Sequence, residues 1–204
     1  MSDINIDDWF KTIREKYAAH MQCGKGCTAC CHGLFDISLE DALQVARGYR
    51  QLPADIRQQV YTRALALQQA ILGHRPPSPT LFGEDDPQID EIVNAANSPP
   101  CPCLGDGGEC LIYDYRPISC RLEGVPMVDT RDGLFSDWCE LNFVDGIPEN
   151  AVNDLKRDYD SINSAEAGRS AKVAARAGIR DHRAITFIPS VISEYEEFWK
   201  QLLL

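Results

Sequence analysis

The distribution of cysteines is the feature that most limits what this chain can fold into. Four of its nine cysteines stand within the nine residues 23–31, and the other five follow between residues 101 and 139. An odd number leaves one thiol over in any fully paired disulfide scheme. Dense cysteines in a reducing compartment are more often metal ligands or catalytic groups than cross-links. We therefore expect a metal-binding core assembled from two separate segments.

Length and charge set the other bounds. A chain of 204 residues is long enough to bury a sizeable core, and we expect one domain spanning residues 1–204. A net charge of −11 argues against nucleic acid as a partner, because phosphate binding needs clustered Lys and Arg. The sequence has no long apolar run, and its acidic start is unlike a secretory leader. We expect no membrane association and a cytoplasmic location.

Apolar periodicity predicts a mainly α fold around an irregular cysteine-rich core, with at most a small β-hairpin. Helical spacing is clear over residues 5–21, after the capping residue Ser38, and from Pro53 to the stop signal at Gly73. A short helix is expected near Ile89, and a helical part over residues 148–204, ending in one amphipathic helix. Between residues 98 and 139, Pro, Gly and Cys replace this periodicity, and glycines at 105, 107 and 108 predict a hairpin turn.

Clustered thiolates select zinc, copper(I) or iron–sulfur centres rather than magnesium or calcium. Cys30 and Cys31 are adjacent, so their side chains diverge and one small tetrahedral centre would take both only with strain. This favours a polynuclear arrangement. Lys25, Arg116 and Arg121 are placed in sequence to offset the negative charge of such a centre.

The cysteines occur in ordered motifs: Cys23-x3-Cys27-x2-Cys30-Cys31, Cys101-Pro102, Cys110-x-Ile112-Tyr113, Arg116-Pro117-x2-Cys120-Arg121 and the later Cys139. Together these motifs resemble the YkgJ-like CxxCxxCC cysteine-cluster family, which is described as zinc- or iron-chelating. The similarity covers mainly residues 23–31 and 98–139. It implies a small metal-binding domain whose ligands correspond to Cys23, Cys27, Cys30, Cys31, Cys101, Cys110, Cys120 and Cys139. Some relatives resemble a flagellin lysine methylase, which would imply redox or protein-modification chemistry. The first gap is three residues where the family name implies two, and Cys103 is either an extra ligand or a free thiol.

Two functions from different classes follow. The first is a metalloprotein that uses an iron–sulfur or other iron centre in redox or protein-modification chemistry, with an unidentified protein partner or substrate. The second is a noncatalytic module that zinc holds together for binding or interaction, since closed thiolate sites stabilise folds. The spacing Cys23-x3-Cys27-x2-Cys30 also equals that of radical S-adenosylmethionine enzymes, but the chain lacks the alternating strands and helices of their barrel.

Other residues carry weaker signals. His32 follows Cys31 directly and is the histidine with a case for metal ligation, although an exposed or packed role is the plainer interpretation. No Ser-His-Asp order, phosphate-binding Gly-Lys-Ser loop or His-Glu-x-x-His motif is present. The sequence therefore gives no support to a hydrolase or a nucleotide-binding protein, and it leaves open whether the chain is an enzyme.

Overall fold

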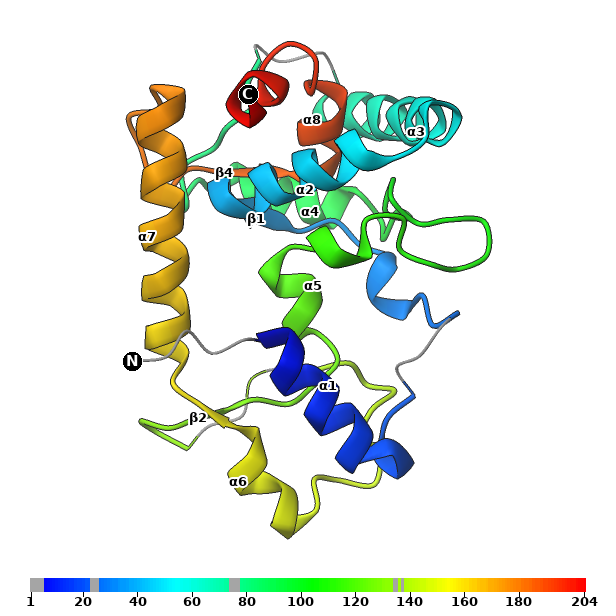
Figure 1. The fold of residues 1–204 in the computed structure, drawn as a ribbon, viewed down its shortest axis with the longest axis vertical. Helices are drawn as coiled ribbons and strands as arrows, with labels where there is room; N and C mark the ends of the chain where they lie inside the picture. The colour runs from blue at the N-terminus through cyan, green and yellow to red at the C-terminus, as the bar shows by residue number, and fades with distance from the viewer. Residues whose placement is uncertain (1–5, 23–25, 74–77, 134–135, 137) are drawn as a thin grey trace.

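The computed structural model describes residues 6–22, 26–73, 78–133, 136 and 138–204. The fold is mainly α, as the periodicity predicts (Figure 1). The α-helices are α1 (Ile6–Lys16), α2 (Leu39–Gln51), α3 (Ala54–Leu72), α4 (Gln88–Ala95), α5 (Ile118–Leu122), α6 (Val152–Leu155), α7 (Tyr159–Ala177) and α8 (Ile188–Ser193). Short 3-10 turns η1 to η5 cover Ala18–His20, Ala29–Cys31, Tyr113–Tyr115, Glu149–Ala151 and Trp199–Leu203.

The predicted helix boundaries after Ser38 and Pro53 are confirmed. The Ser38 side chain accepts a hydrogen bond from the Asp41 backbone N–H at 3.1 Å, which satisfies one free donor at the start of α2. Gly73 ends α3 with φ at 67°, a left-handed conformation that glycine adopts without steric cost. Local sequence thus determines where these two helices begin and end.

Two small sheets complete the secondary structure of the described residues. β1 (Asp36–Ser38) pairs antiparallel with β4 (Ile185–Phe187), joining residues about 150 positions apart in the chain. β2 (Val128–Asp129) pairs parallel with β3 (Lys156–Arg157). The predicted hairpin turn is present as an isolated antiparallel bridge between Leu104 and Cys110. Neither of the two sheets was predicted, because three residues are too few to show an alternating pattern.

The described residues form two main hydrophobic cores. The α2–α3–α8 core includes Leu43, Val60, Val191, Ile192 and Trp199. The α1–α6 core includes Trp9, Ile13, Phe143, Leu155 and Ile162. A smaller cluster joins Ile185 and Phe187 of β4 to Leu34 and Ile89. Figure 1 shows α1, α6 and β2 at one end of the molecule and α2, α3 and α8 at the other.

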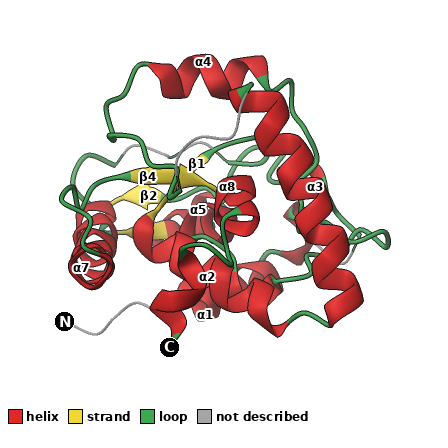
Figure 2. Ribbon diagram, turned by 90° about the horizontal axis from the view of Figure 1, so that it is seen from above, coloured by secondary structure: helices red, strands yellow, loops and turns green. Residues whose placement is uncertain are grey.

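Helix α7 connects the two cores along one side. Ile162 near its start packs in the α1–α6 core, and Val173 and Ala174 near its end pack in the α2–α3–α8 core. The view from above places α7 on the opposite side of the molecule from α3 (Figure 2). In the described part of the chain, no helix combines the length and hydropathy that crossing a membrane requires.

The prediction of one amphipathic helix at the C-terminal end is wrong. The chain instead forms α8, a series of turns and the 3-10 helix η5. The break falls at Glu194, whose buried carboxylate accepts hydrogen bonds at 2.8 Å from the Thr80 backbone N–H and from Gln68 Nε2. Helical periodicity over residues 148–204 is likewise interrupted by β3, after which Asp158 caps a new helix, α7, by accepting from Ser161 N at 3.0 Å.

Candidate metal-binding pocket

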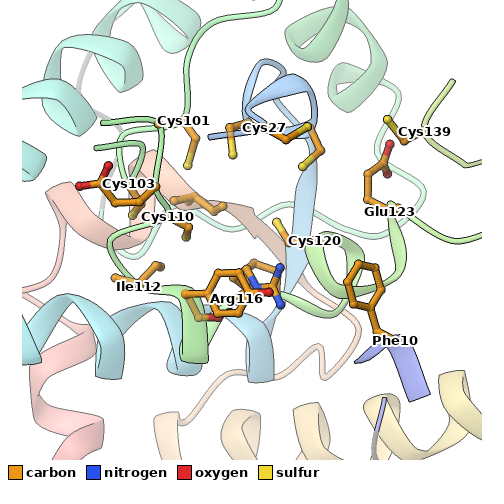
Figure 3. Close-up of a pocket in the computed structure, with 18 of the residues that line it drawn as sticks. Phe10, Cys27, Cys101, Cys103, Cys110, Ile112, Arg116, Cys120, Glu123 and Cys139 are labelled. Carbon is orange, nitrogen blue, oxygen red and sulfur yellow. Dashed lines mark hydrogen bonds between the residues drawn. The ribbon is translucent and has the colours of Figure 1, made fainter. Parts of the chain in front are cut away.

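The eight described cysteines all line one pocket of about 400 Å³ (Figure 3). They are Cys27, Cys30, Cys31, Cys101, Cys103, Cys110, Cys120 and Cys139. All eight are free thiols, so none of them is joined to another as a cystine. Two predicted site residues lie outside the described residues. They are Cys23, expected as a ligand, and Lys25, expected to offset the negative charge of the metal centre. The two cysteine groups that the sequence separates by about 70 residues therefore meet at a single site.

Backbone hydrogen bonds join the two cysteine segments. The N–H of Cys101 donates to the carbonyl of Cys31 at 2.8 Å, and the N–H of Gly33 donates to the carbonyl of Pro99 at 2.9 Å. His32 and Pro100 lie opposite each other between these two bonds, as an antiparallel bridge. This short ladder sets the position of the first cysteine group against the second, whatever occupies the pocket.

The turn between Leu104 and Cys110 forms a second contact with the first group. Gly105 N donates to the Glu109 carbonyl at 2.7 Å, and Leu111 N donates to the Cys103 carbonyl at 2.9 Å, which folds the segment back on itself. Gly108 has φ at 77°, and a Cβ built there would lie 3.3 Å from Thr28 Cγ2. A glycine is needed here both for the backbone conformation and for the close approach of the two loops.

Cys120 and Cys139 come from the other side of the pocket. Cys120 lies on α5, and the N–H of Ile118 at the start of that helix donates to Asp41 Oδ1 at 2.9 Å. The loop that carries Cys139 is fixed by Asn142, which is 1% exposed. Its side chain donates to the Gly124 carbonyl at 2.6 Å and accepts from Gln22 N at 2.7 Å. No sequence pattern predicts this role of Asn142, since a single buried amide leaves no periodic signal.

The pocket lies between the two hydrophobic cores. Cys103 is part of the α2–α3–α8 core, and Cys101 and Cys110 pack against it. On the other side, Ile118 and Leu122 of α5 pack against the α1–α6 core and flank Cys120. Phe10, which packs against the same core from α1, also lines the pocket. Thiols attached to two separately packed units thus face a common space.

Burial and mutual hydrogen bonding shift the pKa values of these thiols. The Cys30 thiol donates to the Cys31 sulfur, which raises the pKa of Cys30 and lowers that of Cys31. Cys103 donates to Cys101 in the same way, raising the pKa of Cys103 and lowering that of Cys101. Burial raises the pKa of Cys110, Cys120 and Cys139, and neighbouring thiolates add to the shift. A bound metal cation would lower the raised pKa values of these thiols, because it stabilises the thiolate form.

The side of the pocket opposite Cys27 and Cys101 carries several apolar residues. In Figure 3, Phe10, Ile112 and Arg116 lie across the space from Cys27 and Cys101. Phe35, Pro117 and Ile188 also line the pocket. The guanidinium carbon of Arg116 lies 3.7 Å from the centre of the Tyr113 ring, and its Nε donates to the Tyr113 carbonyl at 3.0 Å. This contact presents a cation near the thiols, and its charge acts to lower the pKa of Cys110 and Cys120 against the larger effect of burial.

Arg121, which is also expected to offset the negative charge of the centre, contacts the turn that carries Arg116. Its Nε donates to the Arg116 carbonyl at 2.9 Å, so it supports the turn that presents Arg116. Cys103, which the sequence left as an extra ligand or a free thiol, is 1% exposed and donates to Cys101. Within the described ranges, no three Cys, His, Asp or Glu side chains are arranged as a metal site. The fold therefore brings the described cysteines to one pocket, but it does not arrange them around a single metal position.

A scan against models of protein families, a search of curated proteins and a search of solved structures each find no match for this chain. The resemblance to the YkgJ-like CxxCxxCC family stays a prediction that rests on the cysteine motifs.

Proposed function

We propose that this chain is a metalloprotein whose thiol-lined pocket holds an iron–sulfur or other iron centre for redox or protein-modification chemistry. The observation that carries the proposal is the convergence of all eight described cysteines on one pocket from two distant segments. The predicted ligands are Cys27, Cys30, Cys31, Cys101, Cys110, Cys120 and Cys139, together with Cys23. Soft thiolates in this number match iron–sulfur chemistry, and Arg116 offsets part of their negative charge.

The apolar side of the pocket favours a reactive centre over a closed one. A pocket of about 400 Å³ falls within the range of roughly 300–1,000 Å³ that is usual for small-molecule sites. Such sites are mostly apolar with a few placed polar groups, which describes Phe10, Phe35 and Ile112 beside Arg116 and Glu123. The space next to the thiols is therefore suited to a reacting molecule or side chain as well as a metal.

Zinc is the alternative, and the position of the pocket between two cores is the observation that favours it. Two tetrahedral sites of four thiolates would bridge the α2–α3–α8 core and the α1–α6 core without any catalytic role. The protein would then be an interaction module whose shape depends on zinc.

Anaerobic purification without added metal, followed by elemental analysis and visible absorption, tests the proposal. We expect bound iron, acid-labile sulfide and colour that fades in air. A colourless protein with about two zinc ions per chain would support the alternative and contradict the iron proposal. A protein that binds neither metal after reconstitution would contradict both.

Two cysteine variants localise the metal. Cys120→Ala should remove metal and lower soluble yield, because Cys120 faces the pocket from the α1–α6 side. Cys103→Ala should retain more metal than Cys120→Ala. The Cys103 thiol donates to Cys101, and this hydrogen bond together with burial raises its pKa, which disfavours the thiolate form that binds metal. Equal loss in both variants would show that Cys103 is a ligand.

A further inference from the structure

The thiol-lined pocket has a second guanidinium besides that of Arg116. Arg14 lies in the last turn of α1, is half-buried, and lines the pocket together with Phe10. The two residues are four positions apart in the chain, so they lie on the same face of the helix. Helix α1 therefore brings an aromatic ring and a cation to the same wall of the pocket.

The Arg14 side chain has no partner within the residues that the structure describes: it makes no hydrogen bond and no ion pair with them. Lys16, two positions later in the same helix, instead forms an ion pair with Asp154. A guanidinium carries five N–H donors and keeps its charge in proteins. A half-buried guanidinium whose donors the protein leaves unused is available to an anion that enters the pocket.

The charge of Arg14 is also separate from the thiols. The Arg116 guanidinium stacks 3.7 Å from the centre of the Tyr113 ring, and its charge acts to lower the pKa of Cys110 and Cys120. Among the described residues, Arg14 is not one of the main influences on the pKa of any thiol whose pKa is shifted. Arg116 thus serves the thiols, and Arg14 is left for another anion.

The two carboxylates that line the pocket are directed elsewhere. Glu109 folds over its own turn, because a Cβ built at Gly105 would lie 2.6 Å from its carboxylate. Glu123 lies beside Cys139, where its charge acts to raise the pKa of that thiol (Figure 3). Neither carboxylate forms an ion pair with Arg14 in the described part of the chain. The protein's own anions therefore leave the charge of Arg14 unmatched.

We propose that Arg14 binds the carboxylate of a small organic acid whose apolar part packs against Phe10 and Ile112. A guanidinium can form two parallel hydrogen bonds with a carboxylate, and one guanidinium matches its single negative charge. A pocket of about 400 Å³ with apolar walls has the size and character of a small-molecule site. This inference rests on the proposed function, because it names the class of molecule that the metal centre would act on.

Calorimetric titration of the whole chain, kept reduced and oxygen-free, with 3-phenylpropanoate and with its neutral amide tests the assignment. The titrations are made both with bound metal and after its removal, because a carboxylate could also bind the metal itself. We expect the acid to bind more tightly than the amide in both forms. Circular dichroism like that of the wild type checks that each variant described below is folded.

Three variants separate the role of Arg14 from a general effect of charge. Losing a hydrogen bond to a charged group weakens binding by roughly 10- to 100-fold, so Arg14→Gln should weaken binding of the acid by this factor and leave the amide unchanged. Arg14→Lys keeps the charge without the planar fork and should lie between the two. The control Lys11→Gln removes one charge from an exposed position of α1 outside the pocket lining and should bind as wild type.

Three results would overturn the inference: binding of neither compound, equal binding of the acid and the amide, or a preference for the acid that survives in Arg14→Gln. Equal weakening in Lys11→Gln would also overturn it, since the effect would then be one of overall charge. Metal analysis separates this test from that of the proposed function. Acid binding that depends on Arg14 in a chain without iron would support the inference and contradict the iron centre, whereas bound iron without acid selectivity would do the reverse.

Discussion

Asp41 shows how a single side chain positions part of the candidate site. It lies in the first turn of α2, is 6% exposed, and accepts the hydrogen bond from Ile118 N that starts α5, the helix of Cys120. Burial, reinforced by the nearby Glu166, raises the pKa of Asp41 from its ordinary value of 3.8 to about 7. The contact that orients a cysteine helix is thus made by a carboxyl group that burial favours in its protonated form.

We predict that Asp41 makes the metal-free protein lose stability as the pH rises. The folded pKa lies above the unfolded one, so the native state binds more protons between pH 3.8 and about 7. The stability linked to Asp41 is fully present below pH 3.8 and is lost as the pH rises through about 7. At about 1.4 kcal/mol per pKa unit, the loss amounts to a few kcal/mol at most.

Urea unfolding of metal-free, reduced protein across this range measures the effect. Asp41→Asn keeps an acceptor oxygen for Ile118 N and should flatten the pH dependence. The control is Asp55→Asn, at an exposed position in the first turn of α3, which should leave the slope as in wild type. An unchanged slope in Asp41→Asn would refute the prediction.

At the scale of elements, close packing of α2 fixes the segment between Cys110 and Cys120. Gly48 lies in the middle of α2, and a Cβ at this position would lie 2.8 Å from Tyr115 Cβ and 2.9 Å from Ile112 Cβ. Those atoms are attached directly to the backbone, so they can move only if the segment itself moves. The absence of a side chain at Gly48 therefore allows the segment between Cys110 and Cys120 to lie directly on the helix.

We predict opposite outcomes for alanine at two helical glycines. Gly48→Ala gains about 1 kcal/mol of helix propensity but should lose about 1–3 kcal/mol to overpacking, a net destabilisation of up to about 2 kcal/mol. Gly168→Ala in α7 meets nothing within 4 Å and should stabilise by up to about 1 kcal/mol. Urea unfolding of both variants checks this, and stabilisation by Gly48→Ala would show that the contact with Tyr115 yields easily.

For the whole molecule, the thiol pocket joins two units that each have their own core. Trp199 is buried in the α2–α3–α8 core and Trp9 in the α1–α6 core. Helix α7 also connects the two cores, and the backbone ladder at Cys31 connects the two cysteine segments. A metal centre would add bonds from both sides of the pocket. Metal that binds the native state stabilises it by mass action.

We predict that removing the metal lowers the unfolding temperature and makes the two cores unfold less cooperatively. Fluorescence of variants that keep only Trp9 or only Trp199 reports on each core separately. With metal bound, the two midpoints should coincide; after chelation, both should fall and separate. Identical midpoints in the metal-free protein would show that packing alone couples the cores.

The mainly α fold, the caps of α2 and α3 and the two cysteine groups can all be predicted from local sequence, because each depends on residues close together in the chain. Ser38, Gly73 and the spacing of Cys27 to Cys31 are local signals of this kind. Tertiary contacts alone establish that the two cysteine groups share a pocket and that Asn142 holds the loop of Cys139. Those relations depend on contacts between distant segments, and burial and hydrogen bonding across such contacts leave no pattern along the chain.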